Sequence, residues 1–288
     1  MDLSEFAAEV GTADPVTISG TGSRGGAVAG VRTVGAPSGI DWLRADEMTV
    51  GVGAGTTVAE LDHALVEVGQ FVAIPPGGTV GGALAVGRSG LRRLGEGPVR
   101  DALLQARYIS AAGNVVKAGG PTVKNVSGFD LCRLLVGSFG TLGFIGDVIL
   151  RTRPRARHEQ WYVTTTDPLV VFDTMYRPTS MLWDGTTTWI LLAGHERDVE
   201  RAARRHDLQP VGGPPDLPDG GRWSIPPSDL RSLRGTFIAE VGVGLVHHDE
   251  RPPARPVSTT LQALHRRIKH NFDPTGRLNP GLDVLDGG

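Results

Sequence analysis

Short stretches of alternating apolar and polar residues predict several β-strands in the first half of the chain. VTIS (16–19) predicts a short strand, and MTVGVGAG (48–55) predicts a strand whose backbone packs closely against another element, because glycine alternates with apolar residues. DALLQARYISAAGNVVKAGG (101–120) predicts two strands joined by an Ala-Gly-Asn turn. FIGDVILRTRP (144–154) predicts another strand, closed by its proline.

Two stretches show the 3.6-residue period of an amphipathic helix. In TTVAELDHALVEVG (56–69), Thr57 and Glu60 form a capping box and Gly69 can end the helix. Its apolar face consists of Val58, Leu61, Leu65 and Val68. The second helix follows Ser258, its expected N-cap. Its apolar face consists of Leu261, Leu264, Ile268 and Phe272.

The composition of the chain changes after residue 157. Residues 158–250 hold most of the tryptophans, and a proline- and glycine-rich stretch, QPVGGPPDLPDGG (209–221), interrupts them. We therefore expect an α+β protein with a main domain at residues 1–155 and a smaller one at 156–256. Residues 257–288 form a third part, made of the C-terminal helix and a turn-rich tail.

Charge and cysteine content exclude several functional classes. The 288 residues carry a formal net charge of −2 without a basic block, and only 6% of them are aromatic, which argues against nucleic acid as a partner. A single cysteine excludes an intramolecular disulfide or an iron–sulfur cluster held by this chain alone. No apolar run approaches the roughly 18 residues of a membrane span, and MDLSEFAAEVG lacks the features of a signal peptide. We expect a cytoplasmic protein that meets a membrane only through partners.

The segment GTGSRG (20–25) matches the dinucleotide-binding pattern G-x-G-x-x-G, but its context does not. A Rossmann fold requires a helix directly after the glycines. Here AVAGVRTV (27–34) instead reads as another strand. We therefore reject the Rossmann interpretation.

Two glycine-rich segments can still bind phosphate. SGTGSRGG (19–26) and PGGTVGG (76–82) allow inward-pointing amides, and Thr21, Ser23 and Thr79 add hydroxyl groups. A diphosphate held from two sides would use both segments; each one alone could equally be a tight turn at a sheet edge. The surrounding stretch IPPGGTVGGALAVGRSG (74–90) contains so many glycines and prolines that we predict a loop without regular structure.

A third glycine-rich stretch, KNVSGFDLCRLLVGSFGTLG (124–143), completes a resemblance to a known family. In order along the chain, the pieces resemble the PCMH-type, vanillyl-alcohol-oxidase-like FAD-binding flavoproteins, and more narrowly the FAD-binding subunits of bacterial glycolate oxidases. The resemblance covers roughly residues 15–155 and 258–283. Its further segments are VGVGAGTTVAEL, PPGGTVGGALAVGRSG, VRDALL, GSFGTLGFIGDVIL and DPTGRLNPG.

The resemblance implies a fold and a set of cofactor-binding positions. The expected fold has two α/β subdomains around FAD, a small cap domain, and a C-terminal tail that returns to the FAD domain. One group of residues would wrap the FAD diphosphate: Ser19, Gly20, Thr21, Gly22, Ser23, Arg24, Pro76, Gly77, Gly78, Thr79, Val80, Gly81 and Gly82. A second group would lie along the ribityl chain and the flavin: Arg88, Ser89, Gly90, Gly128, Phe129, Asp130, Gly143, Phe144, Ile145 and Asn279. On this view the glycines of 124–143 leave room for the flavin nucleotide; helix termination and turns are the alternative.

Two further expectations concern attachment of FAD. Many relatives bind FAD covalently through a histidine in the first glycine loop, where this chain has Arg24 and no histidine. Cys132 lies among leucines in a helix-like run, which is typical of a buried, unreactive thiol. We therefore expect non-covalent FAD and no metal ion.

The catalytic residues are harder to predict. His247 and His248, in GVGLVHHDE, are candidates for a base, and the alternative is a solvated pair at a domain edge. Lys124 is a candidate for an electrostatic role.

The resemblance implies an FAD-dependent oxidoreductase subunit that acts on a small-molecule substrate, glycolate or a similar 2-hydroxy acid. A second flavoprotein subunit and an iron–sulfur subunit would be its partners. A self-sufficient flavin oxidase or dehydrogenase of another alcohol or sugar, or a non-catalytic flavin-containing relay or scaffold, remains the alternative.

Overall fold

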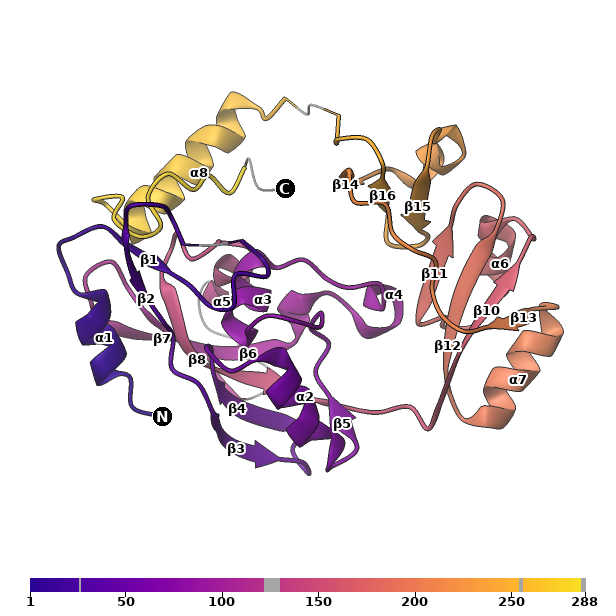
Figure 1. The fold of residues 1–288 in the computed structure, drawn as a ribbon, viewed down its shortest axis with the longest axis horizontal. Helices are drawn as coiled ribbons and strands as arrows, with labels where there is room; N and C mark the ends of the chain where they lie inside the picture. Colours follow the sequence, from indigo (N-terminus) through magenta and orange to yellow (C-terminus); the bar gives the residue numbers. More distant parts are fainter. Residues whose placement is uncertain (26, 122–129, 254–255, 286–288) are drawn as a thin grey trace. The chain divides into compact units, whose positions relative to one another are not determined.

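The structure is a computed structural model that describes residues 1–25, 27–121, 130–253 and 256–285. The chain divides into two compact units. The first unit contains Met1–Gly90, Pro98–Pro154 and the described residues from Val257 to Leu285. The second contains Leu91–Gly97 and Arg155–Pro256. The mixture of helices and antiparallel sheets confirms the α+β class (Figure 1).

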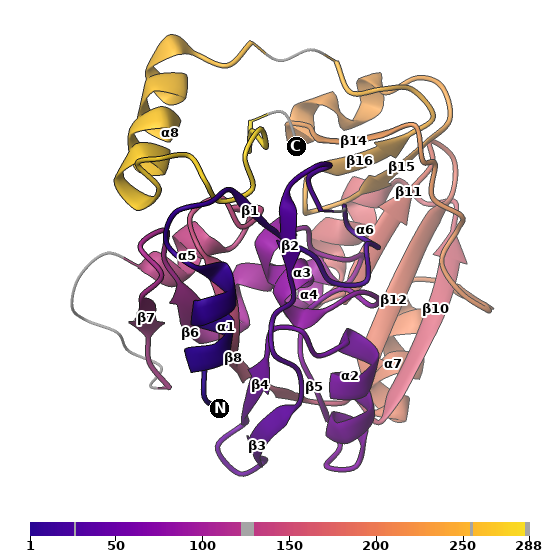
Figure 2. The same ribbon diagram turned by 60° about the vertical axis from the view of Figure 1, so that its left-hand side comes forward.

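A five-stranded antiparallel sheet forms the centre of the first unit (Figures 1 and 2). Its strands, in spatial order, are β3 (Ile40–Arg44), β4 (Thr49–Gly53), β8 (Phe144–Arg151), β6 (Leu103–Ile109) and β7 (Val115–Gly119). The strands predicted within 48–55, 101–120 and 144–154 are therefore confirmed. The last of these continues beyond β8, because Arg153–Pro154 forms a second short strand, β9, which pairs with β5 (Gln70–Phe71).

The glycine-rich segment after the first strand contains no described helix. β1 (Val16–Ile18) pairs in parallel with β2 (Arg32–Val34), and turns and bends occupy the described residues between them. Rejection of the Rossmann interpretation is thereby confirmed. Leu278 forms a bridge to Val16, so the C-terminal segment lies beside β1.

Helices of the first unit pack around these sheets. They are α1 (Ser4–Val10), α2 (Val58–Val66), α3 (Val80–Val86), the 3₁₀ helix η1 (Val99–Asp101), α5 (Leu131–Leu135) and α8 (Thr259–Phe272). Both predicted helices are present, with Thr57 and Ser258 as their N-caps. The buried core includes Val50, Leu61, Leu65, Leu84 and Val148.

The predicted loop at 74–90 is wrong in its second half, where α3 forms. Thr79 caps this helix by accepting a hydrogen bond from the amide of Gly82, and Gly87 ends it in the left-handed conformation. Gly81 lets the helix approach the residue after β4 closely, because a Cβ atom there would lie 2.8 Å from the Cβ of Ala54. Two cap residues and one close contact outweigh the low helix propensity of the glycines.

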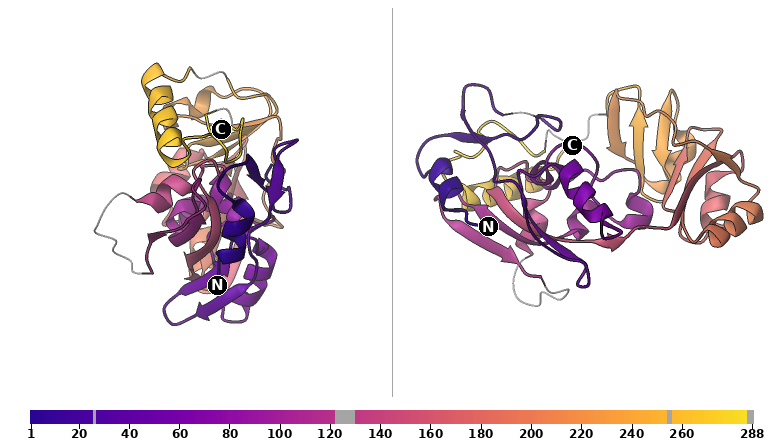
Figure 3. Two further views of the ribbon diagram at one scale, coloured as in Figure 1. Left: turned by 90° about the vertical axis from the view of Figure 1, so that its left-hand side faces the viewer. Right: turned by 60° about the horizontal axis from the view of Figure 1, so that its bottom comes forward.

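A seven-stranded antiparallel sheet forms the second unit (Figures 1 and 3). In spatial order it contains β13 (Gln209–Val211), β10 (His158–Thr164), β12 (Thr188–Gly194), β11 (Ser180–Trp183), β15 (Phe237–Glu240), β16 (Leu245–His248) and β14 (Gly221–Ser224). Its helices are α4 (Arg93–Glu96), α6 (Pro168–Thr174), α7 (Glu196–Arg205) and the 3₁₀ helix η2 (Pro227–Ser232). The sequence placed Leu91–Gly97 in the first part of the chain, but α4 joins the second unit, where the amide of Gly95 donates to the carbonyl of Thr179. A separate core includes Tyr162, Met181, Ile190, Ala239 and Val246.

Two searches of the described residues bear on function. Among their helices, none combines the length and the apolar character that a bilayer crossing requires. They also contain no cluster of three or more histidine, cysteine, aspartate or glutamate side chains that could hold a metal ion.

Candidate functional site

A cavity of about 440 Å³ lies within the first unit and brings together segments that are far apart in the sequence. This volume falls within the roughly 300–1,000 Å³ that is usual for ligand and cofactor sites. Its wall combines the loop after β1, the start of α3, the turn before β8 and two residues of the C-terminal segment, Asn279 and Leu282.

The cavity wall includes many of the residues that the sequence proposed for FAD. These are Ser19, Gly20, Thr21, Gly22, Ser23, Arg24, Thr79, Gly81, Gly82, Gly143, Phe144, Ile145 and Asn279. Both glycine-rich segments therefore contribute to one concave surface.

Other proposed residues do not line this cavity. Val80 is buried in the core, and its amide donates to the carbonyl of Thr56. Ser89 accepts a hydrogen bond from the amide of Val99, and Asp130 caps α5 through the amide of Arg133. The remaining proposed residues outside the wall are Pro76, Gly77, Gly78, Arg88 and Gly90. Lys124, Gly128 and Phe129 lie outside the described residues.

Arg24 joins the two glycine-rich segments. Its Nη1 donates to the carbonyl of Gly77 (2.5 Å), and its Nη2 donates to the carbonyls of Pro75 (2.9 Å) and Pro76 (2.8 Å). Burial lowers the pKa of the guanidinium, but an arginine stays protonated at neutral pH. Arg24 therefore fixes the second segment in place through its backbone, so Pro76 and Gly77 contribute to the site without lining it.

The polar surface of the cavity suits an anion. Within the described part of the chain, the amides of Gly20, Thr21 and Gly22 donate to no protein acceptor, so they can bind a ligand. The hydroxyls of Thr21 and Ser23 lie 3.1 Å apart. Among the described residues of the wall there is no carboxylate, and Arg24 is the only ionisable one. Such a surface can hold a diphosphate without charge repulsion.

Backbone conformation and packing within the protein explain the glycines of 137–143. Gly137 and Gly140 adopt positive φ angles of 85° and 71°, which other residues rarely adopt. A Cβ atom at Gly140 would lie 2.8 Å from Nδ2 of Asn279, and one at Gly143 would overlap the ring of Tyr108. Turns and internal packing therefore favour glycine at these positions. Gly140 and Gly143 also line the cavity, and that they leave room for a flavin stays a prediction.

Asn279 holds the C-terminal segment against the cavity. Its side-chain oxygen accepts from Oγ1 of Thr17 (2.8 Å) and from the amide of Ile18 (3.1 Å), while its Nδ2 donates to the carbonyl of Phe139 (2.6 Å). Its φ of 45° is one of the few positive values outside glycine. Asn279 thus positions the walls of the cavity, because its amide is already hydrogen-bonded to protein.

Sequence reasoning missed several residues of the wall. They are Ile18, Gly35, Ala36, Ala54, Gly55, Ala85, Val86, Ser138, Phe139 and Leu282. Most are small, and a small residue carries no chemical signal of its own. One signal was available, because the alternating glycines of VGVGAG already indicated a close backbone contact, and a Cβ atom at Gly55 would overlap the carbonyl of Ala36.

The two candidate histidines in the second unit are buried or partly buried rather than solvated. Nε2 of His248 lies 2.7 Å from the carbonyl of Arg234, and its Nδ1 accepts from the amide of Glu250. Nε2 of His247 lies 2.9 Å from Oε1 of Glu240, a buried carboxylate. His248 is therefore bonded through both ring nitrogens, whereas His247 resembles an imidazole oriented by a carboxylate.

Cys132 is buried in α5, and its environment disfavours the thiolate. Burial, together with the charge of Asp130, raises the pKa of this thiol to about 11. A thiol in that state is a poor nucleophile at neutral pH.

Comparison with protein families finds two matching domains. Residues 37–119 match the model described as FAD binding domain, and residues 229–282 match FAD linked oxidases, C-terminal domain.

Individual relatives agree with these matches. The chain is 30% identical over 285 residues to glycolate oxidase subunit GlcE of Escherichia coli (strain K12), covering 82% of this chain and 81% of that protein. It is 39% identical over 116 residues to a D-lactate dehydrogenase of Archaeoglobus fulgidus (strain ATCC 49558), a match that covers 39% of this chain but only 26% of that enzyme. A solved alkyldihydroxyacetonephosphate synthase shares the fold, with a TM-score of 0.68 at 14% identity, over 93% of this chain and 73% of that one.

Proposed function

The chain belongs to the PCMH-type FAD-binding family of FAD-dependent oxidoreductases, and from that premise we propose that it is the FAD-binding subunit of an assembly that oxidises glycolate or a similar 2-hydroxy acid. One observation carries this proposal beyond the family assignment. A single cavity unites both glycine-rich segments and offers free amides without a carboxylate among its described residues. The name of the Escherichia coli relative supports the substrate class and the role as a subunit.

The residues of the cavity fit FAD in their chemistry. The amides of 20–22 and the hydroxyls of Thr21 and Ser23 would hold the diphosphate, and Arg24 would keep the opposite wall in place. Val86, Phe144 and Ile145 give the wall an apolar part that excludes water from the rest of the cofactor. When bound, FAD supplies the redox chemistry, so the chain has to supply position, a dry environment and proton transfer.

We further propose that the cofactor is dissociable. The described loop after β1 contains no histidine, and Cys132 lies outside the cavity wall in a state that disfavours reaction. Acid precipitation of the yellow protein should leave the flavin in the supernatant, and colour in the washed pellet would contradict this.

For proton transfer we propose His247. With Nε2 held by Glu240, the neutral ring keeps the lone pair of Nδ1, to which no described residue donates, and this atom can accept the proton of a substrate hydroxyl. Glu240 would orient the ring and stabilise its charged form, as carboxylates do in histidine-dependent catalysis. Oε2 of Glu240 is buried and has no partner among the described residues, while its Oε1 also accepts from Nη2 of Arg222 (3.4 Å).

An anaerobic titration tests the proposal. The FAD-loaded chain is mixed with glycolate, lactate or simple sugars, and the absorbance of the oxidised flavin at about 450 nm is followed with and without a partner subunit. Reduction by glycolate or lactate supports the proposed substrate class. Reduction by sugars alone would favour an oxidase of another alcohol, and no reduction under any condition would favour a scaffold.

The role of His247 needs its own comparison. His247→Ala should retain FAD but lower the rate of flavin reduction by about 10²–10⁴-fold, the usual contribution of a general base. His195→Ala is the matched control, because His195 is exposed at the start of α7 and makes no cap hydrogen bond. Equal reduction rates in the two variants would remove His247 from the mechanism.

A further inference from the structure

The C-terminal helix α8 exposes the first half of its apolar face. None of its 14 residues is buried, and Leu261 and Leu264 are each 41% exposed. Isolated helices of this length are marginally stable in water, and an amphipathic helix normally gains stability by packing its apolar face against something. Phe272 at the end of this face packs against the core of the first unit, whereas Leu261 and Leu264 at its start stay exposed among the described residues.

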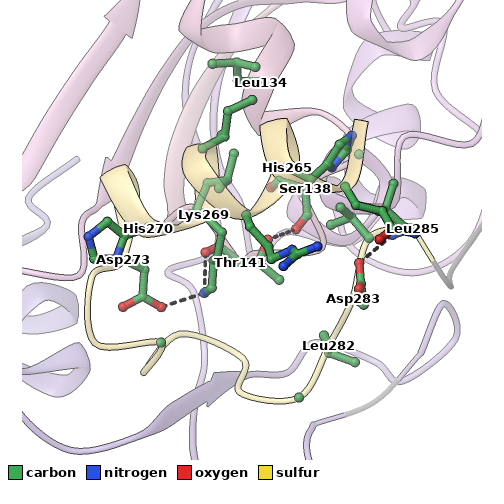
Figure 4. A pocket seen from close by; sticks show the side chains of 18 of the residues that line it. Leu134, Ser138, Thr141, His265, Lys269, His270, Asp273, Leu282, Asp283 and Leu285 are labelled. Carbon is green, nitrogen blue, oxygen red and sulfur yellow. Dashed lines mark hydrogen bonds and ion pairs between the residues drawn. The ribbon is translucent and has the colours of Figure 1, made fainter. Parts of the chain in front are cut away.

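A groove of about 960 Å³ lies beside this helix (Figure 4). Its walls come from α8, α5 and the tail that follows α8, and they include the exposed side chains of Leu134 (36%) and Leu282 (44%). Lys269 closes one part of it, because its ammonium donates to Asp273 (2.6 Å) and to the carbonyl of Thr141 (2.8 Å). The groove shares only Ser138 and Leu282 with the cofactor cavity among the described residues. The groove is therefore a second concave surface, and apolar side chains form part of its wall.

The charge of α8 indicates what could cover it. The helix carries Arg266, Arg267 and Lys269 and no acidic residue, although the whole chain has a formal net charge of −2. Arg266 and Arg267 form no ion pair with any residue that the structure describes. Of the two carboxylates in the groove, Asp273 is neutralised by Lys269, and Asp283 accepts from the amide of Leu285. Arg266 lies in the wall of the groove, whereas Leu261, Leu264 and Arg267 lie on α8 outside that wall. The helix and the groove together therefore combine exposed leucines with an excess of positive charge.

Three kinds of occupant can be compared on this basis. A second copy of the chain that docked through the same face would set α8 against α8, and like charges would oppose each other. A bilayer surface is attracted to basic amphipathic helices, but it cannot fill a concave groove. A partner segment with apolar side chains flanked by carboxylates would match both the shape and the charge.

We propose that α8 and the adjacent groove form the docking surface for an acidic, apolar segment of a partner subunit. The inference rests on the proposed function in one respect, since it takes the chain to be one subunit of an assembly. It adds the location of the interface and the chemistry of the partner segment. Docking would cover leucines that are otherwise exposed, and it would pair arginines that otherwise face solvent.

The test uses the full-length, FAD-loaded chain and the second flavoprotein subunit from the same organism, with affinity measured by calorimetry. Leu261→Glu/Leu264→Glu should raise the Kd at least about tenfold, because it removes apolar contacts and adds like charge. Arg266→Glu/Arg267→Glu should weaken binding similarly and flatten its dependence on salt. Val66→Glu is the control, because Val66 is a 50% exposed apolar residue on a different helix, α2.

Several outcomes would overturn the proposal. They are no binding by the unmodified chain, unchanged binding by both double variants, self-association through α8, and binding to phosphatidylglycerol vesicles that the leucine variants abolish. The flavin spectrum of each variant separates this failure from failure of the proposed function. A variant that keeps FAD but no longer binds the partner subunit supports the interface. An unmodified chain that binds the partner subunit but takes up no FAD would contradict only the proposed function.

Discussion

At the scale of single residues, the main organiser of the candidate FAD cavity is Arg24. The guanidinium bridges two segments about fifty positions apart in the sequence by donating to three consecutive backbone carbonyls. Three consecutive carbonyls need a planar group with several fixed donors, which lysine lacks. Arg24 therefore acts on the ligand site largely through the loop it holds.

Arg24→Lys should weaken FAD binding without unfolding the protein. The lysine ammonium can donate to only one or two of the three carbonyls. The loss of one or two hydrogen bonds of about 1 kcal/mol each predicts a roughly 5–30-fold higher Kd for FAD. Fluorescence titration of the apoprotein with FAD measures this Kd. Arg44→Lys, at an exposed ion pair on β3, is the control, and equal affinities of both variants would contradict the role of Arg24.

Two adjacent glycines, Gly81 and Gly82, should respond differently to substitution. Gly81→Val should destabilise the fold by about 1–3 kcal/mol, because its side chain would collide with the Cβ and carbonyl oxygen of Ala54. Gly82→Ala meets only Oγ1 of Thr79, at 3.1 Å, and should fold but lose affinity for FAD. Urea denaturation and FAD titration separate the two effects; full FAD affinity in Gly82→Ala would remove α3 from the binding surface.

At the scale of elements, two helices with the same type of cap serve different purposes. Thr57 caps α2 within a complete capping box, and α2 packs its apolar face on the core. Thr79 caps α3, whose first turn lines the cavity. A helix that begins in the wall of a cavity must keep its first turn intact for the ligand as well as for the fold.

Thr79→Ala and Thr57→Ala should cost similar stability but differ in FAD binding. Each loses a cap, for which about 1 kcal/mol is typical. Only Thr79→Ala should also raise the Kd for FAD, because Thr57 does not line the cavity. Thermal unfolding of the apoprotein and FAD titration give the two quantities, and a parallel loss of FAD affinity in Thr57→Ala would show that the effect is indirect.

The turn after α8 depends on the charge of Asp273. Burial by itself would raise the pKa of this carboxyl, but the ammonium of Lys269 and the amides of Leu278 and Arg277 outweigh burial and lower it. Because the pKa is lower in the folded than in the unfolded state, the ionised carboxylate stabilises the fold above the unfolded value of about 3.9. This contribution disappears as the pH falls through the lower folded value.

Asp273→Asn should therefore change how stability depends on pH. At pH 7 the variant should lose about 1.5–3 kcal/mol, the usual contribution of a hydrogen bond to a charged group. Below the folded pKa of Asp273 the two proteins should converge in stability. Urea denaturation at pH 7 and at successively lower pH follows this convergence, and a constant difference at all pH values would contradict the assignment.

At the scale of the whole molecule, the described residues form three hydrophobic clusters, two in the first unit and one in the second. The first unit surrounds the five-stranded sheet and contains every residue that lines the candidate FAD cavity. The second has its own core on the seven-stranded sheet and carries His247. If His247 transfers the proton as proposed, cofactor retention and proton transfer belong to different units, and we expect variants in one unit to leave the other function in place.

Thermal unfolding should show two transitions, of which FAD raises only one. A ligand stabilises the part that binds it, by about 2.7 kcal/mol at a concentration of 100 times its Kd. Met181→Ala, in the core of the second unit, should destabilise that unit by about 2–5 kcal/mol and so lower the other transition. Differential scanning calorimetry of both proteins, with and without FAD, tests this prediction. A single transition that shifts both on addition of FAD and in Met181→Ala would show that the units unfold together.

The sequence by itself determined the elements whose signal is local. Alternation marked β4, β6, β7 and β8, and capping residues marked α2 and α8, because strand alternation and helix caps act over a few neighbouring positions. The order of glycine-rich segments also indicated the family and FAD. Only the tertiary structure decided that α3 forms, since its stability depends on the close approach of Gly81 to Ala54. The same holds for Arg24, Asn279 and the small residues of the cavity wall, whose roles depend on partners that are distant in sequence and adjacent only after folding.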